Sequence, residues 1–205
     1  MFSLVIKLLK MLLKKTSARL KFFYRHRHSL NEKSRKTLCS ALIQCHFDYA
    51  CSSWYSALSQ ALKNKLQIMQ NKVVRFVLNL DPRSHIGQRE LDQLKMLYVK
   101  DRVIQLKMNH VFNISNGFSN SYLGSNFNHF SSIHHYNTRN SELNFILPKA
   151  KSQACNTFYF TAIQDWNSLS TDIKSIRNKQ SFKSAIRSHL SLSNMKKEDK
   201  QNILV

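Results

Sequence analysis

The chain of 205 residues is poor in the residues that interrupt helices. It contains only 3 glycines and 2 prolines, so few positions force a helix to bend or stop. Hydrophobic residues make up 42% of the sequence, which is too large a share for a wholly disordered chain. Together these proportions predict a mainly α fold.

Acidic residues are scarce as well. Eleven Asp and Glu stand against 32 Lys and Arg. A polymerase or nuclease needs clustered carboxylates to hold two metal ions, but the only adjacent acids are Glu198 and Asp199 in a lysine-rich tail. Asp48 and Asp165 stand singly, and we expect each to cap a helix, pair with a cation or face water. We therefore expect no enzyme activity, no cofactor and no small-molecule substrate.

The four cysteines are too few and too scattered for a disulfide framework in a chain of this length. Cys39, Cys45 and Cys51, together with His46, leave a zinc site as an alternative. Structural zinc sites, however, usually begin with a pair of ligands two to four residues apart, and here five residues separate neighbouring cysteines. The sequence favours reduced thiols in the core.

The net charge of +21 favours a polyanionic partner, and the backbone of RNA, DNA or an RNA–DNA hybrid is the first candidate. No run of apolar residues is long enough to span a membrane, because Lys7 and Lys10 interrupt the run from Met1 to Leu13. Nuclear or cytoplasmic residence is expected. A mitochondrial presequence or a membrane-surface helix remains the alternative, since residues 1–36 hold eleven Lys or Arg and one acid.

Apolar spacing predicts the helices. The predicted stripes are Leu38, Leu42, Cys45 and Tyr49; Leu62, Leu66, Met69, Val73, Phe76 and Leu80; Leu91, Leu94 and Leu97; Val99, Val103, Leu106 and His110; Phe158, Ala162 and Trp166; and Phe182, Ile186 and Leu190. Five segments follow: a ragged N-terminal helix over 1–14, a helical bundle over 15–112, a polar connector over 113–140, a smaller helical C-terminal unit over 141–192 and a frayed tail over 193–205.

Aromatic residues beside these leucines are expected in the core rather than stacked on bases. This expectation covers Tyr24, Tyr49, Trp54 and Trp166. Cations occupy the other side of the second stripe, at Lys63, Lys65, Lys72 and Arg75. They predict contacts to a phosphate backbone, and a merely solvated helix face is the alternative.

Four short phrases occur in order along the chain. They are Phe47-Asp48-Tyr49-Ala50 with Trp54-Tyr55, Leu66-Gln67 leading into Gln70-Asn71-Lys72, Tyr136-Asn137-Thr138-Arg139, and Trp166-Asn167-Ser168-Leu169. Together they resemble the C-terminal region of reverse transcriptases from non-LTR retrotransposons of the jockey-like and chicken-repeat-like kind, downstream of the polymerase active site. Ser121 and Ser170 stand where that family usually has proline.

The resemblance implies a thumb-like helical clamp that holds a template-primer duplex while an upstream palm, absent here, polymerises DNA on an RNA template. Magnesium would serve only that palm. The resemblance adds Arg25 and Arg27, which follow an aromatic phrase near the first helix, and Arg139 to the expected nucleic-acid contacts. The implied function is that of a non-catalytic fragment of an RNA-directed DNA polymerase that binds nucleic acid without sequence preference.

Overall fold

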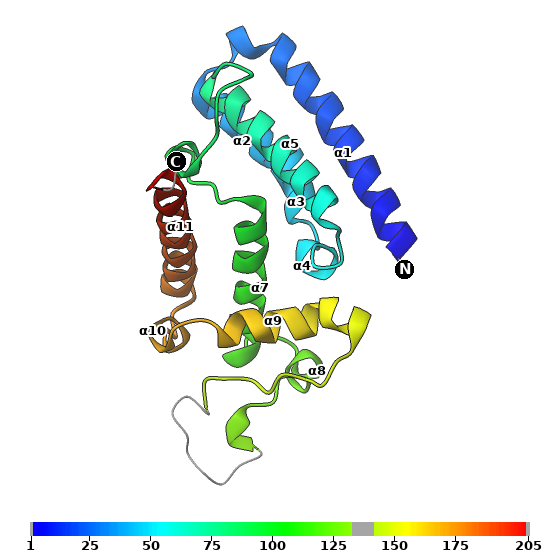
Figure 1. The fold of residues 1–205 in the computed structure, drawn as a ribbon, viewed down its shortest axis with the longest axis vertical. Coiled ribbons are helices and arrows are strands. Elements are labelled where there is room, and N and C mark those ends of the chain that lie inside the picture. The colour runs from blue at the N-terminus through cyan, green and yellow to red at the C-terminus, as the bar shows by residue number, and fades with distance from the viewer. Residues whose placement is uncertain (1, 133–141, 204–205) are drawn as a thin grey trace. The chain divides into compact units, whose positions relative to one another are not determined.

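The computed structural model describes residues 2–132 and 142–203, and these residues are mainly helical, as predicted (Figure 1). Within them, extended pairing is limited to one antiparallel bridge between His129 and Phe145. The chain forms two compact units. The first runs to Val103 and resumes at Asn194, and the second is Ile104–Ser193.

The first unit contains most of the helices of the N-terminal half. These are α1 (Phe2–Arg25), the 3₁₀ turn η1 (Arg27–Ser29), α2 (Glu32–Cys39), the π-helical segment η2 (Ser40–Gln44), α3 (Cys45–Asp48), α4 (Cys51–Trp54), α5 (Gln60–Leu78), α6 (Gln88–Gln93) and the start of α7 (Val99–Ser115). The last part of α11 (Lys179–Ile203) also belongs to it.

The second unit contains the rest of α7, α8 (Ser121–Gly124), the 3₁₀ turns η3 (Phe130–Ser132) and η4 (Ser152–Asn156), α9 (Phe158–Asn167), α10 (Thr171–Lys174) and the first part of α11. Its core is a chain of aromatic rings. Phe112 stacks on Phe182 at 4.4 Å between ring centroids, and Trp166 lies 5.8 Å from Phe182 and 5.9 Å from Phe145. Trp166 is 1% exposed, as the sequence predicted.

Three helical stretches lie side by side in the first unit (Figure 1): α1, the continuous run α2–η2–α3, and α5. Leu66, Met69, Val73 and Phe76 form the buried stripe of α5, as their spacing predicts. The helix ends at Asn79, which adopts the left-handed conformation with φ 56°, a conformation that asparagine tolerates. The last residue of the helix, Leu78, therefore precedes the pair Asp81-Pro82, although proline disfavours helix only for the residue before it.

The stripe predicted for residues 38–49 is wrong in its phase. Cys39, Ile43 and Phe47 are the buried side chains, whereas Leu42 and Cys45 are exposed. The π-helical segment η2 adds a residue to the turn, and it changes which residues face α1 and α5. Tyr49 is 78% exposed, against the expectation that it lies in the core, because the chain leaves the helix at that residue and Ala50 turns left-handed with φ 49°.

The compact units differ from the five predicted segments. α1 continues without a break past residue 14. The boundaries lie inside α7 and α11, not at a polar linker, because neither helix contains a glycine or proline. Residues 113–132 belong to the second unit, where Phe127 is buried and packs on Phe145 and Tyr159. The predicted frayed tail is helical to Ile203. Separate folding of the two units stays a prediction.

Candidate nucleic-acid interface

The outer side of α5 carries the expected cations in an exposed row. Lys65 and Lys72 are exposed and lie seven residues apart, which places them on one side of the helix two turns from each other. Ile68, 53% exposed, lies between them. The opposite side of the helix is packed into the core, so the helix presents both ammonium groups to solvent from a fixed backbone.

Arg27 and Arg75 lie near Tyr24 of α1. The Tyr24 hydroxyl lies 3.4 Å from the carbonyl oxygen of Lys72, and its ring packs on Phe76 at 5.0 Å between centroids. Burial raises the pKa of Tyr24, and the positive charges of Arg75 and Arg27 oppose that rise. These interactions tie the C-terminal end of α1 to α5 and place the charges of Arg27, from η1, and Arg75, from α5, near the same tyrosine.

The other cations expected to contact nucleic acid have different partners within the protein. Arg75 donates from Nε to the carbonyl of Ser84 at 2.8 Å, so it anchors the loop after α5 as well as carrying charge. Lys63 lies over the Tyr55 ring, with Nζ 5.3 Å from its centroid. Arg25 is exposed, and Arg27 donates to the ring of its neighbour His28 at 3.2 Å. Arg139 lies outside the described residues.

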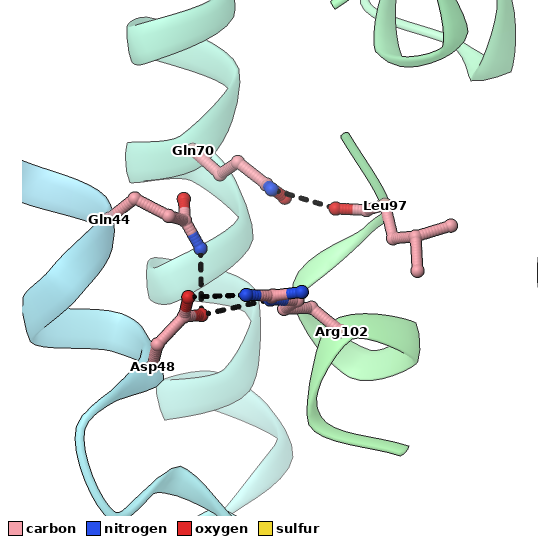
Figure 2. A network of polar contacts seen from close by, with 5 residues as sticks. All are labelled: Gln44, Asp48, Gln70, Leu97 and Arg102. Carbon is pink, nitrogen blue, oxygen red and sulfur yellow. Dashed lines mark hydrogen bonds and ion pairs between the residues drawn. The ribbon is translucent and has the colours of Figure 1, made fainter. Parts of the chain in front are cut away.

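Two residues that carry the family resemblance in the first unit, Asp48 and Gln70, make the polar contacts drawn in Figure 2. Arg102 of α7 donates from Nε and Nη2 to the two carboxylate oxygens of Asp48, at 3.2 and 2.8 Å, and Gln44 donates to the same carboxylate at 3.1 Å. The buried amide of Gln70 donates to the carbonyl of Leu97 at 2.8 Å. Asp48 therefore pairs with a cation, which is one of the three roles expected for it from the sequence.

Gln67 completes this arrangement at the start of α7. Its Oε1 accepts from the backbone N–H of Val99 at 2.9 Å, and its Nε2 donates to Asn71 at 2.8 Å. The first backbone N–H groups of a helix have no partner within the helix, so Gln67 caps α7. Gln67 and Gln70 thus fix the entry into α7 to the side of α5.

The resemblance phrase in the second unit also has a structural role. Asn167 accepts from the backbone N–H of Phe145 at 3.0 Å and donates to its carbonyl at 2.7 Å. Trp166 donates from Nε1 to the carbonyl of Leu143 at 2.8 Å. The pair Trp166-Asn167 therefore holds residues 143–145 against α9, as a neighbouring strand would.

Comparisons of this chain with protein-family models, with curated proteins and with solved structures found no match. The case for a function therefore depends on the side chains described above. In the described part of the chain, no helix is long and apolar enough to cross a membrane. Across those same residues, no three His, Cys, Asp or Glu side chains gather as a metal site would require. Cys39, Cys45 and Cys51 are free thiols.

One basic cluster was not predicted from the sequence. Arg19 of α1 donates from Nη1 to the carbonyl of Leu42 at 2.7 Å and also contacts Nε2 of His46. Lys15 lies one turn earlier on the same side of α1. The spacing of Lys15 and Arg19 is visible in the sequence, but His46 is 27 residues beyond Arg19 and no local pattern joins them.

Proposed function

We propose that this chain is a non-catalytic nucleic-acid-binding unit of the kind that follows the active site in non-LTR retrotransposon reverse transcriptases, and that it binds the phosphate backbone of RNA, DNA or hybrid duplexes. The observation that carries the proposal is the exposed pair Lys65 and Lys72 on a helix whose opposite side is packed. Rigidly mounted cations position a duplex through its phosphates and do not read its bases.

The test compares pairs of lysines with equal charge. The variant Lys65→Gln/Lys72→Gln removes two charges from α5, and Lys149→Gln/Lys151→Gln removes two exposed charges from the second unit. If α5 contacts the duplex, the plot of log affinity against log salt should be less steep for the first variant, by about 1.8 for B-form DNA, because each phosphate contact contributes about 0.9 to the steepness.

The control variant should change this slope by much less. Equal losses from the two variants would show attraction to a generally basic surface and would contradict a defined interface. Binding is measured by fluorescence anisotropy with labelled DNA, RNA and hybrid duplexes over a series of salt concentrations. A primer-extension assay with magnesium or manganese should show no incorporation, and template-dependent extension would overturn the non-catalytic part of the proposal.

A second candidate is supported by the exposed apolar residues of α1. Leu8, Met11 and Phe22 are 45%, 48% and 57% exposed and lie beside lysines, as in helices that bind membrane surfaces or direct import into mitochondria. A fluorescent protein fused after residue 30 tests this candidate. Accumulation of the fusion in mitochondria would favour it, and nuclear or cytoplasmic signal would favour nucleic-acid binding.

A further inference from the structure

The basic cluster formed by α1 and α3 is held in place before any ligand binds. One arm of the Arg19 guanidinium donates to the Leu42 carbonyl at 2.7 Å, and this bond fixes the side chain across the π-helical segment η2. The same Nη1 contacts Nε2 of His46. Lys15 is exposed one turn before Arg19. A guanidinium held in this way loses little further freedom when it binds an anion.

In the described part of the chain, the ion pairs Arg102–Asp48 and Lys107–Asp165 do not involve Lys15, Arg19 or His46. Burial lowers the pKa of His46, and the charges of Arg19 and Lys15, both on α1, lower it further. On its own segment, the nearest acid in sequence is Asp48, and that carboxylate is bound by Arg102 and Gln44. An anion would therefore find two cations, Lys15 and Arg19, and an imidazole that can gain a proton, with none of the three paired to an acid among the described residues.

The contact between Arg19 and His46 also defines the protonation state of the imidazole. Arginine can only donate, so Nε2 of His46 accepts and the ring is neutral. When the ring gains a proton, Nε2 becomes a donor and can no longer accept from Arg19. Three cationic donors then converge, which is unfavourable in the absence of an anion and suits the several acceptor oxygens of a phosphate.

We propose that Lys15, Arg19 and His46 form a phosphate-binding site that takes one backbone phosphate of a nucleic acid, and that His46 binds a proton together with that phosphate. The source of the phosphate rests on the proposed function above, whereas the site itself rests on the geometry of the three side chains. By linkage, an anion that binds the protonated ring more tightly raises its pKa, and the affinity for the anion increases as the pH falls.

The test follows the ring signals of His46 by NMR as the pH is varied. The full chain is titrated in sodium chloride, in inorganic phosphate at equal ionic strength and with a short DNA duplex. We expect the duplex to raise the pKa of His46 by about one unit, which corresponds to roughly tenfold tighter binding to the protonated form. An unchanged pKa in the presence of bound duplex would overturn this site.

Two variants distinguish binding of the duplex at this site from general electrostatic attraction of the duplex to a basic surface. Lys15→Gln should reduce the duplex-induced rise in the His46 pKa by half or more. Lys14→Gln, an equal loss of charge at the neighbouring exposed residue, should leave that rise unchanged. Equal effects of the two variants would contradict a defined site. His46→Gln keeps an acceptor for Arg19 and should remove the gain in duplex affinity between pH 7.5 and pH 5.5 that depends on this ring.

The outcomes also distinguish the two proposals. If the duplex binds through Lys65 and Lys72 but the pKa of His46 does not change, the phosphate site is overturned and the proposed function remains. If inorganic phosphate raises that pKa and no duplex binds, the proposed function and the nucleic-acid source of the phosphate are both overturned.

Discussion

Both units expose lysines, but among the described residues the buried lysines all belong to the second unit. In the first unit, Lys65 and Lys72 are exposed on α5. In the second unit, Lys107 and Lys174 are 5% and 6% exposed, and each ammonium group is used within the fold. Lys107 pairs with Asp165, and Lys174 donates to Asn144 Oδ1 and to the carbonyl of Asn167, both at 2.9 Å.

The comparison shows why a net charge is a poor measure of an interface. The value of +21 counts a buried lysine and an exposed lysine equally, although only the exposed one can release counterions by contacting a phosphate. Burial lowers the pKa of Lys174, which means that burying its charged form is energetically unfavourable. The candidates for binding are therefore the lysines that remain at the surface, such as those on α5 and α1 of the first unit.

The largest expected effect concerns the buried pair of the second unit. Asp165→Ala should lower the free energy of unfolding by about 3 kcal/mol, because it leaves the Lys107 ammonium buried without its counter-charge. The double variant Lys107→Met/Asp165→Leu should be closer to the original protein, since it removes the charge as well. Urea unfolding followed by circular dichroism gives the values. A loss below about 1 kcal/mol for Asp165→Ala would mean that Lys107 reaches water.

The next effect tests two buried thiols of the first unit, Cys39 and Cys51. Burial raises the pKa of Cys39 to about 12 and that of Cys51 to about 11, above the ordinary value of 9.0. As the pH rises, the thiols lose their protons in the unfolded chain before they do so in the folded protein. The free energy of unfolding is therefore unaffected by these thiols below pH 9, and it falls as the pH rises from 9 towards the pKa values of the folded protein. At pH 10 each thiol should cost about 1.4 kcal/mol relative to pH 8.

Substitution of the thiol provides the control for this pH effect. In Cys39→Val the difference in unfolding free energy between pH 8 and pH 10 should be smaller by about 1.4 kcal/mol, whatever the change in stability at pH 8. Changing Cys45, which is exposed, should leave the pH dependence as it was. An equal pH dependence in all three proteins would show that other groups cause it.

Helix positions followed from the sequence wherever one apolar stripe ran unbroken. The stripe from Leu66 to Phe76 and the residues Phe182, Ile186 and Leu190 are buried as their spacing predicts. The prediction failed at residues 38–49, because a π-helical segment shifts the phase of the stripe and spacing alone does not reveal it. Charge also could not distinguish Lys72, which is exposed, from Arg75, which bonds the loop after its own helix.

The phrases that carry the family resemblance were expected to mark a clamp for nucleic acid. In the structure, Gln67, Gln70 and Asp48 hold the start of α7, and Asn167 holds Phe145. These contacts link residues more than 20 positions apart, so nothing local in the sequence could predict them. The candidate site at Lys15, Arg19 and His46 was missed for the same reason.

A third effect tests the neutral amides that hold the first unit together. Gln70→Leu removes the side-chain donor to the carbonyl of Leu97, a residue that is only 4% exposed. Because that carbonyl would lose its hydrogen bond, the free energy of unfolding should fall by about 1–2 kcal/mol. Gln60, at the exposed start of the same helix, provides the control. Gln60→Leu should change stability by less than about 0.5 kcal/mol. Equal values would show that water replaces the lost donor at Leu97.

The smallest expected effect is the stability of the variant Lys65→Gln/Lys72→Gln. Exposed lysines contribute little to folding, and removing two like charges from a strongly basic protein relieves repulsion. The free energy of unfolding should therefore change by less than about 0.5 kcal/mol and in the stabilising direction, as measured by urea unfolding at low salt. A clear destabilisation would show that these lysines also support α5, and weaker duplex binding by the variant would then reflect a disturbed fold. A small change, set against the large loss expected for Asp165→Ala, would confirm that exposed and buried lysines have different roles in this protein.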